Sequence, residues 1–205
     1  VVLSLKNEYI QKVIAFNDEK KDKIDNVDGI EVVKCGCFTK IAAQSLSISY
    51  ERNLHNLMED FNPDIVVFHY PNPFVAALLL RELKKSKAKL VLYWHLDIVR
   101  QKYLKLLFTS QNKSLLARAD KIIATSPNYI EGSKWLQSVK TKCIVIPNCI
   151  NVERMEITQE IEKKVLNIRA QNKNKTICVA VGRHTEYKGF SYLIQASKFL
   201  DDSFH

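Results

Sequence analysis

Short apolar runs with strand character alternate with amphipathic stretches along most of this sequence. Runs rich in Val, Ile, Leu and aromatic residues are typical of buried strands, and the stretches between them have the spacing of helices with one apolar face. We expect strands at residues 12–16, 30–33, 65–70, 90–94, 121–125, 143–146 and 176–181. This alternation predicts an α/β fold with a parallel sheet, because helices are the usual connections between parallel strands.

The expected helices lie between these strands. They are residues 1–11, 45–60, 74–85, 101–119, 128–136, 152–170 and 191–200. We expect the 101–119 helix to break near Ser110, and we interpret residues 17–28 and 171–175 as polar loops. Residues 65–70 are almost continuously apolar, which is typical of a parallel strand buried on both faces.

Glycine is scarce, and its placement excludes the common glycine-rich nucleotide loops. The chain has 5 glycines among 205 residues, and no window spells G-x-G-x-x-G or a Walker A loop. The composition, 46% hydrophobic and 26% charged, is typical of a globular protein. No apolar run approaches the ~18 residues of a membrane span, and no secretory signal peptide is recognisable. Five cysteines without framework spacing favour free thiols in a reducing cytosol.

The net charge of +9 is concentrated in one part of the chain. Residues 81–121 hold 11 basic and 3 acidic residues, which makes the charge of this stretch +8. Such a block can be the solvated face of helices, or it can face nucleic acid, anionic lipid headgroups or phosphorylated substrates. No nucleic-acid-binding motif accompanies it, so we expect no nucleic-acid partner.

The segment VGRHTEYKGF, residues 181–190, brings a turn glycine and two cations to the junction between an expected strand and an expected helix. Open α/β sheets bind ligands beyond the carboxyl ends of their strands, and helix N-termini attract anions. Gly182 allows a sharp turn, while Arg183 offers a fork of donors and Lys188 a point charge, a pairing suited to a diphosphate. On spacing alone, an ordinary basic loop remains an equal alternative.

The pattern G-R-x-x-x-x-K-G-F, with the helix that follows it, closely resembles the start of the second domain of GT-B glycosyltransferases of family 4. Further segments are similar to the same family in the same order, and they cover most of the chain. They are VFHYPNPF at 67–74, YWHLDIVR at 93–100, ADKIIATSP at 119–127 and VIPN at 145–148. The resemblance implies a GT-B fold: a Rossmann-like parallel sheet with helices on both faces, plus only the first βα unit of the second Rossmann-like domain.

The resemblance also implies a division into three parts. Residues 1–150 would be the N-terminal, acceptor-side Rossmann-like domain without its first strand, and 151–175 the hinge helix and linker. Residues 176–205 would begin the C-terminal nucleotide-sugar-binding domain. Because the family's glycine-rich first loop and its later E-x7-E carboxylate pair have no counterpart here, we expect a fragment truncated at both ends and inactive alone. At the hinge, Cys149 stands where the family usually has glycine.

Each site residue is carried over from the family by its matching position. In the family, the arginine and the lysine that match Arg183 and Lys188 bind the donor diphosphate and neutralise the charge that builds as the nucleotide leaves. His95, just past an expected strand, is the third expected catalytic residue. We expect it to contact the sugar or the acceptor; the alternative is that it is an ordinary loop histidine without a role in the reaction. The expected substrate-binding residues are Asp97, Gly182, Ser126 and Asn148. We interpret His69 as structural.

We expect no metal and no cofactor. The sequence lacks the D-x-D carboxylate pair of metal-dependent glycosyltransferases, and Cys35-Gly36-Cys37 has no second cysteine pair with which to form a zinc site. The only small molecule that the resemblance requires is a nucleotide-diphosphate sugar, which is the donor substrate.

The resemblance therefore predicts a retaining transferase that moves a hexose from a nucleotide-diphosphate sugar to a glycan or lipid-linked acceptor. It places the protein in surface polysaccharide or lipopolysaccharide biosynthesis, in the cytoplasm, with residues 81–121 contacting the anionic inner membrane face. The alternative is a non-catalytic module that binds nucleotide sugars or membrane surfaces. A GT-B sugar epimerase would need further acid and base residues. The donor base, the sugar, the acceptor and the oligomeric state are not predicted.

Overall fold

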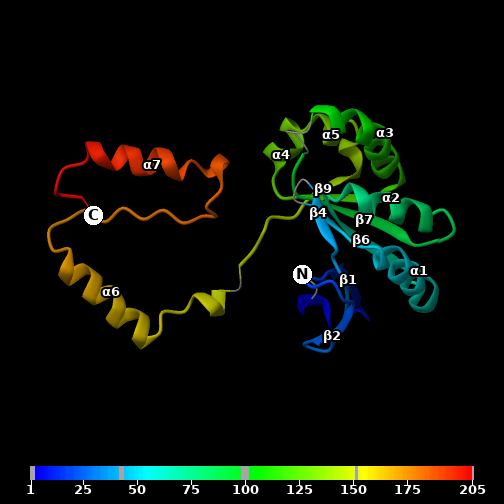
Figure 1. Cartoon of the computed structure of the whole chain (residues 1–205), viewed down its shortest axis with the longest axis horizontal. Helices are drawn as coiled ribbons and strands as arrows, with labels where there is room; N and C mark the ends of the chain where they lie inside the picture. Colours follow the sequence, from blue (N-terminus) through cyan, green and yellow to red (C-terminus); the bar gives the residue numbers. More distant parts are fainter. Residues whose placement is uncertain (1–2, 42–43, 98–101, 151, 205) are drawn as a thin grey trace. The chain divides into compact units, whose positions relative to one another are not determined.

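The computed structural model describes residues 3–41, 44–97, 102–150 and 152–204. The chain divides into two compact units, Val1–Asn148 and Cys149–His205 (Figure 1). The first unit contains all the β-sheets among the described residues, and the second is built mainly from helices and turns.

The largest sheet of the first unit has four strands, all parallel, which confirms the predicted α/β class. In sheet order, these strands are β6 (Ile65–Tyr70), β7 (Lys89–Trp94), β8 (Lys121–Ala124) and β9 (Cys143–Val145). The helices that flank them are α1 (Ser49–Phe61), α2 (Pro73–Glu82), α3 (Lys102–Arg118), α4 (Pro127–Gly132) and α5 (Lys134–Gln137). Helices α1, α2 and α3 pack in succession, each against the next (Figure 1).

Two smaller sheets precede this one in the chain. The first has the order β1-β3-β2, with β1 (Lys12–Phe16) parallel and β2 (Lys23–Val27) antiparallel to the central β3 (Ile30–Cys35). The second is the hairpin of β4 (Thr39–Ile41) and β5 (Gln44–Leu46). A 3₁₀ turn, Leu3–Leu5, stands at the start of the described chain.

Two helices of this unit begin by the same local mechanism, directly after a strand of the parallel sheet. Asn72 accepts a hydrogen bond from the Val75 amide through its side chain (3.1 Å), and Pro73 begins α2. Ser126 does the same for the Tyr129 amide (3.1 Å), and a proline again follows it. A side-chain acceptor satisfies an otherwise unpaired amide, and proline at the first helical position has no amide to leave unpaired. These caps hold the segments that follow the carboxyl ends of β6 and β8.

The core lies between the parallel sheet and its helices. Leu90, Leu92 and Trp94 alternate along β7 and are fully buried, as are Leu115 of α3 and Ile122 of β8. Burial of a large apolar side chain contributes roughly 1.5–3 kcal/mol. Strand β7 is therefore the most buried strand of the parallel sheet, and its carboxyl end holds the candidate site.

Strand β6 differs from the expectation that it is buried on both faces. Phe68 and Tyr70 are buried, whereas Ile65 and Val67 are about half exposed. The reason is its position, because β6 is the edge strand of the four-stranded sheet. One of its two faces, which also carries His69, stays open to solvent.

Two predictions for the first 30 residues are wrong. The expected 1–11 helix is only a 3₁₀ turn in its described part, because a helix this short has no stability without a packed face and Ile10 is 88% exposed. The expected 17–28 loop contains β2, which pairs with β3 through a tight turn at Asp28 and Gly29 (φ 52° and 89°). Asp-Gly between two strands is a strong hairpin signal, and it was present in the sequence.

Five further segments differ from expectation. Helix α3 is continuous, without a break at Ser110. The expected 45–60 helix begins only at Ser49, because the residues before it form β5. The expected 128–136 helix is divided at Ser133, whose hydroxyl caps α5. In the second unit, the expected 152–170 helix is a 3₁₀ turn (Val152–Met155) followed by α6 (Gln159–Gln171), which Thr158 caps. Residues 176–181 form no strand; Thr176 makes one isolated bridge with Phe204. An apolar run becomes a strand only where a neighbour supplies hydrogen bonds.

Lys142 ties the segment before β9 to the C-terminus of α3. Its ammonium donates to the carbonyls of Leu116 (3.1 Å), Ala117 (2.7 Å) and Ala119 (2.7 Å). We expect Lys142→Ala to lower the free energy of unfolding by about 1–2 kcal/mol, because it leaves helix-terminal carbonyls without a donor and removes a cation from the negative end of the helix dipole. Urea unfolding followed by circular dichroism measures this loss. The matched control is Lys140→Ala, an exposed lysine of the same turn; an equal loss in both variants would contradict the capping role.

Candidate active site

The candidate site in the first unit lies where β6 and β7 end. His69 is paired in register with Tyr93, and His95 follows β7 directly, with its amide donating to the Tyr70 carbonyl (3.2 Å). Carboxyl ends of neighbouring parallel strands are the usual place for ligands in open α/β sheets. The strand register therefore brings two histidines, 26 residues apart in sequence, to one edge.

The rings of His69, Tyr93 and His95 form a stacked cluster. Their centroids are 4.6–5.2 Å apart and their planes differ by 9–16°. Nδ1 of His69 lies 2.9 Å from Nε2 of His95, which makes a hydrogen bond between the two imidazoles; we call these two residues the histidine pair. Both keep part of their surface open to solvent, so the pair is accessible to a ligand.

Partial burial lowers the pKa of both histidines below the ordinary value of 6.5. For His69 the neighbouring His95 lowers the pKa further. Both rings are therefore neutral at pH 7, and each has one N–H donor and one lone-pair acceptor. A neutral imidazole at a strand end can orient a hydroxyl group without attracting a second anion.

Asp97, an expected substrate-binding residue, is the centre of a hydrogen-bond network within the first unit. Its Oδ1 accepts from Trp94 Nε1 (2.7 Å), from the Ser133 hydroxyl (3.1 Å) and from the Tyr129 hydroxyl (3.4 Å). Burial and the Asp97 carboxylate raise the pKa of Tyr129 to about 12, so its hydroxyl stays protonated. The Trp94 indole is fully buried and stacks on the Tyr70 ring, with the two ring centroids 3.8 Å apart. Asp97 thus joins the end of β7 to helices α4 and α5.

The two other expected residues of this unit also make internal contacts. The Ser126 hydroxyl caps α4 through the Tyr129 amide, and Asn148 Oδ1 accepts from the Tyr93 hydroxyl (3.3 Å). Asn148 is therefore linked to the ring stack, and Ser126 is linked through Tyr129 to the Asp97 network. Tyr93 and Tyr129 connect these groups, and the sequence reasoning missed both. A signal for Tyr93 existed, because it precedes His95 by two residues at the same strand end.

The expected diphosphate residues lie in the second unit, in an exposed loop before α7 (Phe190–Ala196). Arg183 Nη2 donates to the Tyr187 hydroxyl (3.1 Å), and the Lys188 ammonium is 5.4 Å from the centroid of the same ring. Hydrogen bonds from Thr185 and Arg183 lower the pKa of Tyr187. One tyrosine therefore holds the two cations of the motif close together.

The two glycines of this loop have separate structural reasons. Gly189 has φ 70°, the left-handed conformation that ends the turn Glu186–Lys188 and that other residues adopt at a cost. A Cβ on Gly182 would lie 3.1 Å from the ring of Phe190, on which His184 stacks at 5.1 Å. Gly182 thus lies close to an aromatic ring, and a larger residue there would need that ring to shift, a role in addition to the expected ligand contact.

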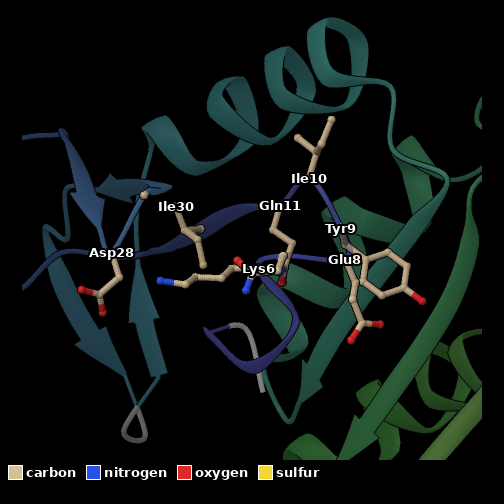
Figure 2. Close-up of a pocket in the computed structure, with 9 residues that line it drawn as sticks. Lys6, Glu8, Tyr9, Ile10, Gln11, Asp28 and Ile30 are labelled. Atoms are coloured by element: carbon tan, nitrogen blue, oxygen red, sulfur yellow. The ribbon is translucent and has the colours of Figure 1, made fainter.

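Two hollows in the first unit lie away from these residues. One of about 480 Å³ is lined by residues 6–11 and the β2–β3 turn, at the amino ends of β1 and β3 (Figure 2). Figure 2 shows Lys6, Glu8 and Asp28 around it. Another, of about 420 Å³, lies between α1 and α2 and contains the ion pair of Arg81 with Glu51. Neither is lined by an expected site residue.

Three further observations concern the part of the chain that the structure describes. In residues 3–41, 44–97, 102–150 and 152–204, no three His, Cys, Asp or Glu side chains are placed to hold a metal ion. No described helix is long and apolar enough to cross a membrane. All five cysteines are free thiols.

The parallel sheet, with polar and aromatic side chains gathered at its carboxyl edge, defines an open α/β protein, a class whose members usually bind ligands at that edge. Residues 6–154 match the model of Glycosyltransferase Family 4. The chain is 30% identical over 159 residues to O-antigen chain mannosyltransferase C of Escherichia coli, covering 78% of this chain and 41% of that protein. It is 31% identical over 107 residues to D-rhamnosyltransferase WbpZ of Pseudomonas aeruginosa, covering 52% and 27% respectively.

This chain belongs to glycosyltransferase family 4, which confirms the family indicated by its motifs. It spans less than half the length of the two curated relatives that it matches. The family match covers the first unit and ends at residue 154, before the loop that contains Arg183 and Lys188. The roles of those two residues therefore depend on their geometry and on experiment.

Proposed function

We propose that the whole protein is a retaining glycosyltransferase that moves a hexose from a nucleotide-diphosphate sugar to a glycan or lipid-linked acceptor. The match of residues 6–154 to family 4 carries this proposal. The names of the two relatives, a mannosyltransferase of O-antigen chains and a rhamnosyltransferase, support a hexose or deoxyhexose donor and a surface polysaccharide product.

In this proposal, residues 1–150 form the acceptor-side domain, 151–175 the hinge helix and linker, and 176–205 begin the domain that binds the nucleotide sugar. Arg183 and Lys188 neutralise the diphosphate, and their shared neighbour Tyr187 supports the assignment, because it keeps two cations in one small region. Preformed positive charge at a leaving group is worth several kcal/mol in other enzymes. Neither a metal nor a cofactor is needed for this step.

The proposed chemistry is a front-face displacement. The bond between the anomeric carbon and the diphosphate oxygen breaks, and the acceptor oxygen forms its bond on the same face of the sugar. The proton of the acceptor hydroxyl passes to the departing diphosphate. His95 contacts the transferred sugar or the acceptor. Asn148 and Ser126 bind substrate from the same edge of the sheet, and Asp97 positions the segment that follows β7.

Release of nucleoside diphosphate tests this function directly. The whole protein is incubated with UDP- and GDP-hexoses, with and without glycan acceptors, and both hydrolysis and transfer are measured. We expect release of nucleoside diphosphate that depends on the acceptor with at least one donor, and a product that retains the anomeric configuration of the donor sugar. A protein that binds the nucleotide sugar without turnover would show that it is a binding module instead.

Among the described basic residues of the stretch 81–121, some form ion pairs and others do not. Lys89 and Arg118 pair with Asp120 (3.5 and 3.2 Å), and Arg118 also donates to the Ala88 carbonyl (2.7 Å). Within the described residues, the exposed Lys84, Lys85 and Lys87, between α2 and β7, form no ion pair. We propose that these three lysines are the part of the stretch that contacts anionic lipid headgroups.

Changing these three lysines to glutamine should reduce binding to anionic vesicles by about two orders of magnitude, because each basic residue near such a surface contributes about 1 kcal/mol. Flotation with phosphatidylglycerol-containing vesicles at low and high salt measures the bound fraction. The control is the same triple change at Lys163, Lys173 and Lys198, exposed lysines of the second unit. An unchanged bound fraction, or an equal loss in the control, contradicts the proposal.

A further inference from the structure

The histidine pair has a hydrogen-bonding arrangement that assigns a different task to each ring. The nitrogens in contact are Nδ1 of His69 and Nε2 of His95, 2.9 Å apart. The remaining nitrogens, Nε2 of His69 and Nδ1 of His95, are the outward ends of the pair. Any ligand that contacts the His95 ring through a nitrogen must therefore use Nδ1.

Two tautomeric arrangements satisfy this contact when both rings are neutral. In one, His69 donates from Nδ1, and both rings carry their proton on Nδ1. In the other, His95 donates from Nε2, and both rings carry their proton on Nε2. The Nε2–H tautomer is the intrinsically favoured form of a neutral histidine side chain, so the second arrangement places both rings in their favoured form. Which nitrogen of a histidine is protonated is set by the bond that the other nitrogen makes.

The packing holds the His95 ring so that this bond persists. Tyr93 stacks against both imidazoles, with centroids 5.1 Å from His69 and 4.6 Å from His95. The Tyr93 hydroxyl is itself tied to Asn148, and the His95 amide is bonded to the Tyr70 carbonyl. The His95 side chain is thus restrained by a ring, a backbone bond and the nitrogen of His69.

We propose that His69 is a positioning residue for His95: by accepting the Nε2 proton of His95, it fixes the ring and leaves the Nδ1 lone pair to accept a hydrogen bond from a substrate hydroxyl. This inference rests on the proposed function, since it names the polarity of the contact that His95 makes with the sugar or the acceptor. His69 itself does not touch the reacting atoms. It extends the role of a residue first interpreted as structural.

Long-range ¹H–¹⁵N NMR of the histidine side chains tests the pair without any activity. In the whole protein at neutral pH, His95 should show a protonated Nε2 and an unprotonated Nδ1, with its signals assigned from a His95→Gln sample. In His69→Phe, which keeps a ring in the stack but has no acceptor, the two ¹⁵N shifts of His95 should move toward each other as the tautomers mix. Unchanged His95 shifts in His69→Phe, or a proton found on Nδ1 in the parent chain, overturn the inference.

A conservative rescue separates positioning from packing. His69→Asn places an amide oxygen near the position of Nδ1 and should restore the parent His95 shifts, whereas His69→Gln extends past that position and should not. In the whole protein, His69→Phe should lower kcat/KM for transfer by about 10- to 100-fold, and His69→Asn should recover most of that loss. If the NMR results are as expected but no variant changes transfer, the positioning is real and the proposed role of His95 in transfer is wrong. If transfer is absent in the parent protein too, the proposed function itself fails.

Discussion

Replacing Arg183 with alanine should lower kcat/KM for sugar transfer by about 100- to 1,000-fold, and Lys188→Ala should have an effect of similar size. Loss of a single preorganised group that stabilises developing negative charge typically costs this much in other enzymes. Both side chains contact Tyr187: Arg183 donates a hydrogen bond of 3.1 Å to its hydroxyl, and the Lys188 ammonium lies over its ring. Steady-state release of nucleoside diphosphate from the preferred donor measures both effects.

The pattern of the loss separates the two possible roles of these cations. If they act on the leaving diphosphate, kcat should fall more than KM rises, because the charge that they neutralise is larger in the transition state than in the bound donor. Arg183→Lys should recover little activity, since an ammonium cannot reproduce the bidentate fork of a guanidinium. If KM alone rises, the loop binds the donor without assisting its cleavage.

Arg169→Ala and Lys198→Ala are the matched controls for this comparison. Both are exposed basic residues of the second unit, in the last turn of α6 and in the 3₁₀ turn Ser197–Phe199. Each removes one positive charge, as the test variants do, so a nonspecific effect of net charge would appear in all four proteins. Full activity in both test variants refutes the assignment of the motif.

Asp97→Ala should lower the free energy of unfolding of the first unit by about 2–3 kcal/mol. The change removes the acceptor of the Trp94 indole N–H, which is fully buried, and that of the Ser133 hydroxyl, which is nearly so. A buried donor left without a partner loses its hydration with no replacement. Chemical denaturation followed by the fluorescence of the tryptophans measures the effect.

Asp97→Asn distinguishes this structural role from substrate binding. The amide oxygen of asparagine still accepts a hydrogen bond from Trp94, so most of the stability should return. The stability control is Asp60→Ala, an exposed aspartate near the end of α1. Equal destabilisation by the alanine and asparagine variants contradicts the network as described. A stable Asp97→Asn protein that has lost transfer would show that the carboxylate also contacts the substrate.

The alternation of apolar runs and helical stretches predicted the parallel sheet well, because buried parallel strands carry a local signal in nearly every residue. Strands 65–70, 90–94 and 121–125 agree with β6, β7 and β8 to within a residue at each end. The β2–β3 hairpin was missed because strand β2 is polar: its Asp25 forms ion pairs with Lys23 of the same strand and with Lys34 of β3. Charged cross-strand pairs stabilise a sheet without leaving an apolar pattern.

The elements of the second unit were predicted less well for a different reason. Residues 176–181 have strong strand character, yet they have no ladder partner among the described residues. Their conformation depends on a neighbour rather than on their own composition. The start of the helix after Gly189 was predicted correctly, because glycine with a positive φ ends one turn and the periodic segment then begins another; the helix itself ends at Ala196, before the expected residue 200.

The sequence by itself determined the family, the α/β class and the residue types of the proposed diphosphate motif, because these depend on local patterns that a chain carries whether or not it is folded. Only the tertiary structure decided which side chains meet. These contacts join residues up to 55 positions apart: His69 meets His95, Tyr93 meets Asn148, and three donors converge on Asp97. Such contacts are set by strand register and by the face on which each side chain lies, and neither can be deduced from local periodicity.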